Sequence, residues 1–557
     1  MKYDSEVDVL IVGSGAAGLT AALRARFLGL KPLVVEKTSH LGGTSAYSGG
    51  CLWIPQNFAS IAAGISDSPA DALGYMNAVV GDVGAASSPA RKLAYLQQGP
   101  QMVNFLHQLG FNWVVSKGCP DYYPSAPGAM HSWGRTMEPA VFDLEKLGAW
   151  KQYMRVKPRA IPPLFAYESF SLTKAGSSIG DTATGLLVVS RGWWKKTLGE
   201  QPVTMGQSLV GQLLYLNLGL GNKMWRETSL VGLIQANDGS VLGAQVQQGD
   251  KLCNIRARKG VLLCAGGYAR NKQMRQTHGP SPSSIEWTNV AEGDTGDAIV
   301  AGVKAGAATT LMDNAWWGPA IKDPNTGTYI FALQERSRPH SIIVDQTGSR
   351  FMNEAAPYVE AGNNQYRRNQ VAKSIPAWLI IDSNHRKRYF LGSLMPRQEP
   401  KIGLEAGHIH KADSLDELAV KLSLPPPALQ ETVTRFNSMA QKGTDLDFHR
   451  GESLFERYFG DVKVSPNPSL GGLTTPPYYA VTLVPGDLGT IGGLQTDEDG
   501  RVLRKDASVI SGLYAAGNTA ASVMGRSYIA TGATLGPALT FAFVAVNHMA
   551  QRSISTD

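Results

Sequence analysis

Hydrophobic runs and a glycine-rich turn at the start of the chain predict a strand, a helix and a second strand. Residues 8–12 form an apolar run, residues 13–18 form the turn, and residues 19–28 follow a helical pattern. Gly29 ends that helix, and residues 31–35 form a second apolar run before an acid, Glu36. This order is typical of the first βαβ unit of an α/β dinucleotide-binding domain.

The turn has the GxGxxG spacing, and Glu36 lies 18 residues beyond Gly18. Gly13 permits a tight turn, Gly15 lets the backbone approach a pyrophosphate, and Gly18 lets the helix pack on the sheet. A carboxylate such as Glu36 accepts hydrogen bonds from a ribose hydroxyl. The predicted cofactor-binding residues here are Gly13, Ser14, Gly15, Ala16, Ala17, Gly18, Glu36 and Lys37.

A second glycine- and serine-rich loop follows at residues 41–50. It offers further backbone donors for a second part of a large, permanently held cofactor, which favours FAD over NAD; a plain surface loop is the alternative. The candidates in this loop are Gly43, Thr44, Ser45, Ser48, Gly49 and Gly50.

Later segments repeat the pattern of a strand that runs into a glycine turn. Residues 229–246, with Asn237-Asp238-Gly239 at the centre, predict a hairpin. Residues 260–267 and 512–518 each predict a buried strand followed by a glycine turn. Residues 533–546 predict a buried apolar helix, shorter than the ~20 residues that a membrane span needs.

Composition narrows the class of protein. A chain of 557 residues exceeds one ordinary core and predicts two or more domains. The net charge of +7, without a cluster of basic and aromatic residues suited to nucleic acid, gives no reason to expect a nucleic-acid partner. Acids before the first apolar run are unlike a secretory signal. None of the four cysteines (Cys51, Cys119, Cys253, Cys264) forms a CxxC pair, so we expect a cytoplasmic protein without a disulfide framework or metal site.

Basic and aromatic residues alternate in the segment 147–200. This mixture suits an anionic membrane surface, an oligomer interface or an ordinary solvent-exposed face. If the segment binds a membrane surface, we expect the cytoplasmic protein to associate peripherally with the inner face of the membrane. The residues are Trp150, Lys151, Tyr153, Arg155, Lys157, Arg159, Phe165, Tyr167, Phe170, Lys174, Arg191, Trp193, Trp194, Lys195 and Lys196.

Several motifs resemble known flavoproteins. VDVLIVGSGAAGLTAA, VVEK, GGTSAYSGG and GLYAAGN resemble the FAD-binding domain of the fumarate reductase/succinate dehydrogenase flavoprotein superfamily. GGCLWIP, MNEAAPY, VPGDLGTIGG and NTAASVMGRSY, followed by GATLGPALTF, are most similar to the 3-ketosteroid Δ1-dehydrogenases within it. The resemblance extends from the first predicted strand to the last predicted helix.

The resemblance implies an α/β fold in which a Rossmann-like FAD-binding domain is split in sequence around an inserted α+β catalytic domain. The expected parts are 1–273 and 464–557 for the FAD-binding domain and 274–463 for the catalytic domain, with 147–200 as an insertion. Residues 465–477, rich in Pro and Gly, are the expected return linker. Further FAD contacts implied by the resemblance are Ala265, Gly266, Gly517, Asn518, Ala533 and Leu535.

The implied reaction removes two hydrogens from the A ring of a 3-ketosteroid, as a proton from C2 and a hydride from C1 that passes to flavin N5. A C–H beside a ketone becomes acidic only where donors stabilise the enolate oxygen and a base faces the proton. The resemblance assigns the donors to Tyr528 and Gly532. It assigns the base to Tyr358, assisted by Tyr122, with Tyr123 as an alternative to Tyr122. A free tyrosine has a pKa of ~10, so the base needs such assistance.

The sequence leaves other possibilities open. A 3-ketosteroid Δ4-(5α)-dehydrogenase would share the fold, and a non-catalytic flavin-binding protein is a more distant alternative. A dicarboxylate reductase would need a histidine that 489–493 lacks, and Arg526 alone is no dicarboxylate clamp. Cys119 stands where an aromatic wall residue is expected, while Trp316 and Trp317 suit either the wall or the core. Turnover also requires an external electron acceptor, of which a quinone is one candidate.

Overall fold

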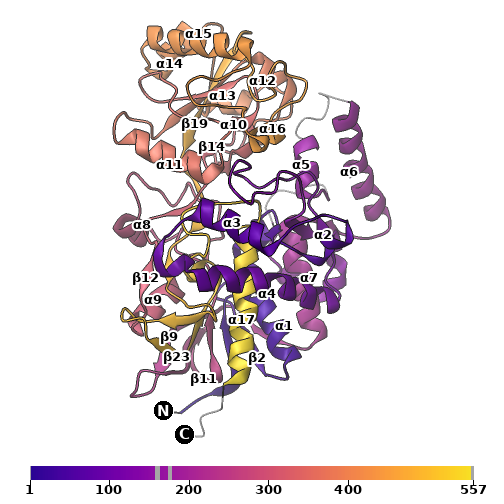
Figure 1. Cartoon of the computed structure of the whole chain (residues 1–557), viewed down its shortest axis with the longest axis vertical. Helices are drawn as coiled ribbons and strands as arrows, with labels where there is room; N and C mark the ends of the chain where they lie inside the picture. Colours follow the sequence, from indigo (N-terminus) through magenta and orange to yellow (C-terminus); the bar gives the residue numbers. More distant parts are fainter. Residues whose placement is uncertain (1, 157–162, 173–178, 553–557) are drawn as a thin grey trace.

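The computed structural model describes residues 2–156, 163–172 and 179–552, and Figure 1 shows two regions of sheet and helix stacked along the long axis. The lower region holds both the first and the last strands of the chain. The α/β fold expected from the sequence is confirmed.

The first sheet is built on β1, which pairs in parallel with β2 and β11; β11 pairs in parallel with β23. Successive residues of β1 enter opposite cores, because strand side chains alternate between faces: Val9 and Ile11 enter one core, and Leu10 and Val12 enter the other. The strands are β1 (Ser5–Val12), β2 (Pro32–Val35), β8 (Lys223–Trp225), β9 (Thr228–Gln235), β10 (Val241–Gln248), β11 (Lys251–Leu263), β22 (Arg501–Leu503) and β23 (Val509–Ala515).

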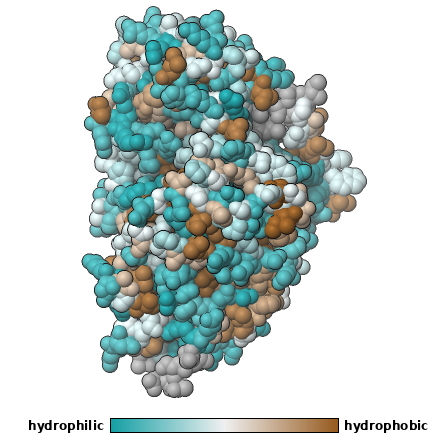
Figure 2. All heavy atoms as spheres, viewed as in Figure 1, coloured by the Kyte–Doolittle hydropathy of each residue, from teal (hydrophilic) through white to brown (hydrophobic). Residues whose placement is uncertain are grey.

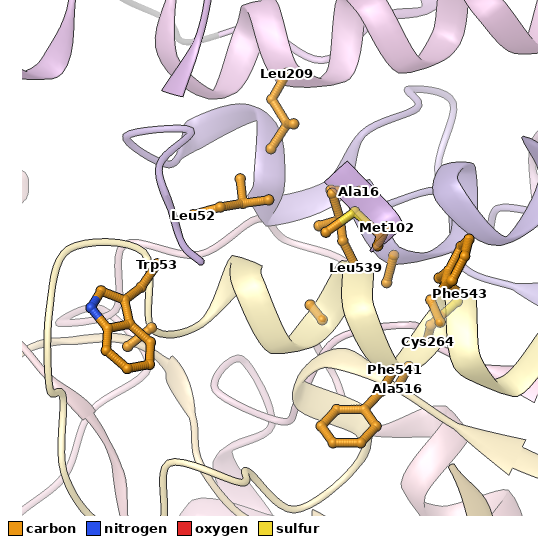
Figure 3. Packing of buried hydrophobic residues seen from close by; sticks show 14 of the residues in the cluster. Ala16, Leu52, Trp53, Met102, Leu209, Cys264, Ala516, Leu539, Phe541 and Phe543 are labelled. Carbon is orange, nitrogen blue, oxygen red and sulfur yellow. The ribbon is translucent and has the colours of Figure 1, made fainter. Parts of the chain in front are cut away.

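Helices from both ends of the chain share one core on this sheet. In Figure 3, Ala16 of α1, Met102 of α4, Leu209 of α7 and Leu539 of α17 gather in one cluster. The predicted apolar helix is confirmed as α17, and Pro537 is its third residue, where a missing N–H costs little. The helices are α1 (Ala16–Phe27), α2 (Phe58–Ala62), α3 (Pro69–Val80), α4 (Pro89–Gln108), α7 (Met205–Gly219), α8 (Lys272–His278), α9 (Asp297–Lys304) and α17 (Leu535–Gln551).

The second sheet is antiparallel and has its own two cores. Its strands are β14 (Ala320–Lys322), β15 (Tyr329–Phe331), β16 (Ser341–Val344), β17 (Ala377–Ile381), β18 (Ile409–Ala412) and β19 (Tyr478–Val484). The helices of this region are α10 (Leu333–Ser337), α11 (Tyr358–Asn369), α12 (Ser383–Arg388), α13 (Lys401–Glu405), α14 (Leu415–Leu422), α15 (Pro426–Lys442) and α16 (Leu454–Phe459).

Short strand pairs complete the structure. Two of them, β12 with β21 and β13 with β20, join segments just before β14 to segments just after β19. The short strands are β3 (Leu52–Trp53), β4 (Trp113–Val115), β5 (Thr136–Pro139), β6 (Phe142–Asp143), β7 (Pro202–Val203), β12 (Thr309–Thr310), β13 (Ala315–Trp317), β20 (Asp487–Thr490) and β21 (Gly493–Leu494).

Strand pairing moves the expected domain boundaries. The segment 465–477 leads into β19, which pairs with β14, β17 and β18, so it does not return the chain to the first sheet as expected. At the other boundary, Ala298 and Ile299 of α9 pack into a core of the first sheet. We therefore propose residues 320–484 for the catalytic unit in place of 274–463. Composition missed this because pairing between distant strands leaves no local pattern.

The insertion 147–200 divides between the core and the surface. It contains η3 (Leu144–Tyr153) in part, α5 (Ala166–Leu172) and α6 (Ile179–Thr197), which stands at the right-hand edge of Figure 1. Lys157, Arg159, Lys174 and the side chain of Phe170 lie outside the described residues. None of the helices in the described ranges is both long and apolar enough to cross a membrane.

Candidate active site

A cavity of about 870 Å³ begins where β1, β2, β11 and β23 end, and it reaches β15 and α11 of the second sheet. Ligands of open α/β sheets bind at the carboxyl ends of the strands. The volume is in the range of pockets that hold cofactors and small molecules. The four cysteines are buried free thiols, and Cys51 and Cys264 line the cavity.

The fingerprint turn requires its glycines. Gly13 has a φ of +108°, and a Cβ there would lie 2.5 Å from the Cys264 carbonyl oxygen. A Cβ on Gly18 would lie 2.0 Å from the Gly13 carbonyl oxygen, so Gly18 serves the packing of α1 and does not line the cavity. The N-cap residue of α1 is Gly15, which has no side chain, and the Ala16 amide donates to Ser45 Oγ at 3.1 Å. Gly15, Ala16 and Ala17 line the cavity, so the positive end of the helix faces the space that a phosphate would occupy.

Glu36 and Lys37, which follow β2, each have defined partners. Glu36 accepts hydrogen bonds from the Ser14 hydroxyl (2.7 Å) and the Ser14 amide (3.2 Å). The Lys37 ammonium lies 2.6 Å from a carboxylate oxygen of Asp297. Both Glu36 and Lys37 line the cavity.

Most of the predicted cofactor-binding residues meet at this cavity. The exceptions are Gly18 and Ala533, which is buried in the core of the first sheet. The residues that do line it are Gly13, Ser14, Gly15, Ala16, Ala17, Glu36, Lys37, Gly43, Thr44, Ser45, Ser48, Gly49, Gly50, Ala265, Gly266, Gly517, Asn518 and Leu535.

Sequence reasoning missed three polar residues at the same end. Arg155 bonds to Glu292 at 2.6 Å and lines the cavity, so this basic residue of the insertion does not face outward. Asp294 and Asn289 also line it, and within the described structure Asp294 Oδ1 and Asn289 Nδ2 are buried without hydrogen-bond partners. The acid- and glycine-rich run 292–297 was the available signal. These unpartnered atoms, with the glycine turns and the N-terminus of α1, fit a dinucleotide of the size of FAD.

Burial raises the pKa of Asp294 to about 7, and the negative charge of Asp487 adds to the rise. The carboxyl therefore resists ionisation in the folded protein unless a ligand donates to it.

Three predicted tyrosines form one cluster at the other end of the cavity. The ring centroids of Tyr358 and Tyr528 are 4.6 Å apart, and that of Tyr122 lies 5.6 Å from Tyr358 and 5.8 Å from Tyr528. All three line the cavity together with Gly532. They come from three distant segments, so only the fold brings them together.

Backbone contacts decide which of two adjacent tyrosines enters the cluster. The Tyr122 amide donates to the Ile529 carbonyl at 2.9 Å, and its hydroxyl lies 3.0 Å from Thr531 Oγ1. The Tyr123 amide donates to the Tyr75 hydroxyl instead, and Tyr123 does not line the cavity. The geometry therefore favours Tyr122 over the alternative Tyr123.

Gly532 is fixed against strand β3. Its φ is +96°, and a Cβ would lie 2.6 Å from the backbone of Leu52. Its carbonyl accepts a hydrogen bond from the Trp53 amide at 3.3 Å, and its own amide interacts with the Tyr528 hydroxyl. The two expected donors thus lie side by side.

The cluster favours neutral phenols. Burial raises the pKa of Tyr358 well above its ordinary value, and the charges that Tyr122 and Tyr528 would carry add to the rise. Burial also raises the pKa values of Tyr122 and Tyr528. A tyrosine that accepts a proton here needs compensating positive charge or hydrogen-bond donors.

Most of the other residues that line the tyrosine end of the cavity are apolar: Ile330, Phe331, Leu333, Phe459 and Leu488. The polar ones are Thr326, Thr328, Thr531 and Asp323, whose carboxylate already accepts hydrogen bonds from the amides of Asn325, Thr326 and Ser393. Among the described lining residues the only Lys or Arg side chains are Lys37 and Arg155, which contact the cofactor-side loops. This end therefore fits a neutral, apolar molecule.

The cavity is not lined by four other residues that the sequence singled out: Arg526, Trp316, Trp317 and Cys119. Arg526 pairs with Asp313 at 2.8 Å on the surface and does not line the cavity. Trp316 and Trp317 belong to the core, and the Trp316 ring packs 5.4 Å from that of Tyr528. Cys119 Sγ lies 3.3 Å from Thr531 Oγ1 and supports the Tyr122 side.

Comparison with known proteins gives concordant matches. Residues 8–535 match the FAD binding domain family. The chain is 42% identical to a 3-oxosteroid 1-dehydrogenase of Mycobacterium tuberculosis, over 98% of this chain and 99% of that one. It is 44% identical to a 3-oxosteroid 1-dehydrogenase of Mycolicibacterium smegmatis, over 97% and 96%. A crystal structure of the 3-ketosteroid Δ1-dehydrogenase from Sterolibacterium denitrificans, in complex with 1,4-androstadiene-3,17-dione, has a TM-score of 0.92, 37% identity, and coverage of 98% and 99%.

Asp294→Asn tests the cost of burying this carboxyl. The folded-state pKa of about 7 lies above the ordinary value of 3.8, so the folded cofactor-free protein loses stability as pH rises between the two values. The neutral amide avoids this loss. Urea unfolding should show the variant and the parent alike near pH 4, with the variant ahead by up to ~4 kcal/mol above pH 7. Glu431→Gln, exposed on α15, is the control; equal stability of parent and Asp294→Asn at pH 8 would contradict the prediction.

Proposed function

The chain belongs to the FAD binding domain family and, within it, to the family of the 3-oxosteroid 1-dehydrogenases, and from this premise we propose its reaction. It is an FAD-dependent oxidoreductase. We propose that it dehydrogenates the A ring of 3-ketosteroids between C1 and C2.

The observation that carries this proposal is the tyrosine cluster at the apolar end of the cavity. Tyr358, Tyr122 and Tyr528 face the same space as the Gly532 amide, within one cavity that also contains the cofactor turns. Phenols and an amide polarise a neutral ketone, whereas a dicarboxylate would need cations that the described wall at this end lacks.

The donors activate the substrate. The Tyr528 hydroxyl and the Gly532 amide bind the 3-keto oxygen and stabilise the negative charge that grows on it. This stabilisation lowers the barrier to loss of the C2 proton, which passes to the oxygen of Tyr358. Tyr122, whose hydroxyl lies 3.0 Å from Thr531 Oγ1, is the group that we propose to assist by donating a hydrogen bond to the Tyr358 oxygen.

The cofactor-side residues hold FAD. The fingerprint turn and the start of α1 face its pyrophosphate, Glu36 its ribose, and the loops at 43–50, 265–266 and 517–518 the remainder. When bound, FAD supplies the acceptor for the hydride that leaves C1. The product gains a C1–C2 double bond, and an external acceptor, with a quinone as the candidate class, takes the two electrons onward.

The alternative with the same fold is dehydrogenation at C4–C5. The names of the relatives at 42% and 44% identity favour C1–C2. A dicarboxylate reductase is disfavoured because Arg526 is paired with Asp313 on the surface.

Substrate and regiochemistry can be tested together. The purified yellow protein is incubated in separate reactions with a 4-ene-3-ketosteroid and with the corresponding 5α-saturated ketone. Each reaction contains an artificial electron acceptor. Both ketones should lose two mass units, and NMR should show new vinyl protons at C1 and C2. A 4-ene product from the saturated ketone alone would establish the C4–C5 alternative, and no turnover of either would overturn the proposed function.

Tyr358→Phe removes the oxygen that receives the C2 proton. We expect turnover to fall by roughly a thousandfold while the flavin absorbance and the melting temperature stay near the parent values. Tyr123→Phe, the adjacent tyrosine outside the cavity, should keep nearly full turnover. Near-normal activity in Tyr358→Phe would remove this residue from the reaction.

We also propose that α6 docks on a lipid surface. It exposes apolar side chains, with Trp193 67% and Trp194 63% exposed, close to Lys195 and Lys196. In Figure 2, brown side chains lie at the right-hand edge, where Figure 1 draws α6. Exposed Trp and Leu beside lysines suit the interface of an anionic bilayer, into which sterol-like substrates partition.

Flotation on liposomes tests the docking surface. The parent should rise with vesicles that contain anionic lipid, and the double variant Trp193→Ser/Trp194→Ser should stay with the soluble protein. A matched variant, Val371→Ser, removes an exposed apolar residue from the catalytic region and should float like the parent. Equal flotation of the parent and the double variant would contradict the proposal.

A further inference from the structure

A buried guanidinium lies behind the tyrosine cluster. Arg336, on α10, is fully buried, and its Nη1 donates to the Glu354 carbonyl oxygen. Its Nε and Nη2 have no hydrogen-bond partners among the described residues. A buried cation with unpartnered donors is costly, so its position calls for a physical reason.

Two buried carboxylates of this region, those of Glu354 and Asp445, pair with other arginines. Glu354 receives two bonds of 2.8 Å from Arg350 and one of 3.0 Å from Arg450. Asp445 pairs with Arg350 at 2.9 Å. Arg336 forms no ion pair within the described ranges. Neither of these two carboxylates therefore neutralises its positive charge.

Arg336 instead lies close in the chain and in the fold to the residues that hold the tyrosine cluster. Arg336 lies three residues after Leu333, which lines the cavity, and five after Phe331, whose ring centroid lies 5.1 Å from that of Tyr358. The carbonyl it binds, that of Glu354, belongs to the loop that leads into Tyr358 at the start of α11. Burial lowers the pKa of Arg336 to about 10 and the positive charge of Arg450 adds to the lowering, whereas Glu354, Tyr122 and Tyr358 each favour the charged form of Arg336.

We propose that Arg336 is a positioning residue that supplies the positive charge needed for Tyr358 to act as a base, through its field on the Tyr122–Tyr358 pair. This rests on the proposed function. A nearby positive charge favours the phenolate, whereas burial disfavours it. The charge of Arg336 thus offsets the rise in the pKa of Tyr358 that burial in the apolar pocket causes.

Other groups around the pair do not provide this charge. Tyr528, Cys119 and Cys51 are neutral or become negative on ionisation, and Glu354 is neutralised by Arg350 and Arg450. Glu360, on the first turn of α11, interacts with Arg367 and with Arg336 itself. The titratable groups that interact with the pair are Cys119, Tyr528, Tyr458 and Arg336; Cys51 interacts with Tyr528, and Arg450, Glu354 and Glu360 interact with Arg336.

The test reads the ionisation of residue 358 directly. A trifluorinated tyrosine, whose acidity brings titration into an accessible range, is placed at position 358 in the holoenzyme and followed by fluorine NMR against pH. Arg336→Met should raise its pKa by about one unit or more, and Arg336→Lys should restore most of the parent value. If Arg336→Met does not fold, Arg336→Gln makes the same comparison.

Arg386→Met is the matched control. Arg386 is buried and donates to the carbonyl oxygens of Tyr389, Met395 and Gln398, away from the cavity. Its loss should leave the fluorotyrosine pKa unchanged.

Kinetics separates the two proposals. With Tyr358 intact, the rising limb of kcat against pH should move to higher pH in Arg336→Met and return in Arg336→Lys, with a smaller change in KM. An unchanged fluorotyrosine pKa in folded Arg336→Met would overturn the role of Arg336 and leave the proposed function standing. A parent enzyme that turns over no 3-ketosteroid would overturn the proposed function, and the NMR comparison would still show whether Arg336 controls residue 358.

Discussion

The contact between Gly532 and β3 is the constraint on which the site depends. A side chain at position 532 would collide with the backbone of Leu52, and the positive φ there suits glycine alone. The contact lets the loop that carries Tyr528 lie flat on the N-terminal part of the chain, just before α17 begins. The same loop holds the Tyr122 backbone through Ile529. The cofactor-side turns and the groups that we propose to bind the ketone therefore share one support.

Burial has opposing effects in this cavity. An apolar wall suits a steroid-like ligand and strengthens each hydrogen bond to a developing enolate. The same wall raises the pKa values of the tyrosines that face it. Catalysis by phenols thus requires charge placed outside the wall, and the second sheet brings buried arginines to that side.

The sequence could predict what depends on local spacing. The first βαβ unit, the hairpin at 229–246 and α17 are all visible as patterns, and the glycine turns that meet at the cavity lie at strand ends. Tyr122, Tyr358 and Tyr528 were found only through motif resemblance, because a lone tyrosine has no distinctive spacing. Arg336 gave no such signal, and Asp294 gave only the acid- and glycine-rich run 292–297: their importance arises from burial and missing partners, which only the fold creates. The place of β19 in the second sheet was missed for the same reason.

The division of the first sheet also affects how the protein is made. β11 is synthesised early, yet its parallel neighbour β23 follows some 250 residues later, after the whole second sheet. β10 already pairs with residues 251–256 on this edge of β11, but residues 261–263 stay unpaired there while the inserted unit folds. An unpaired apolar edge invites misassociation. The nascent chain cannot close its flavin pocket until the segment from 509 onward has emerged, so cofactor capture is a late event in biosynthesis.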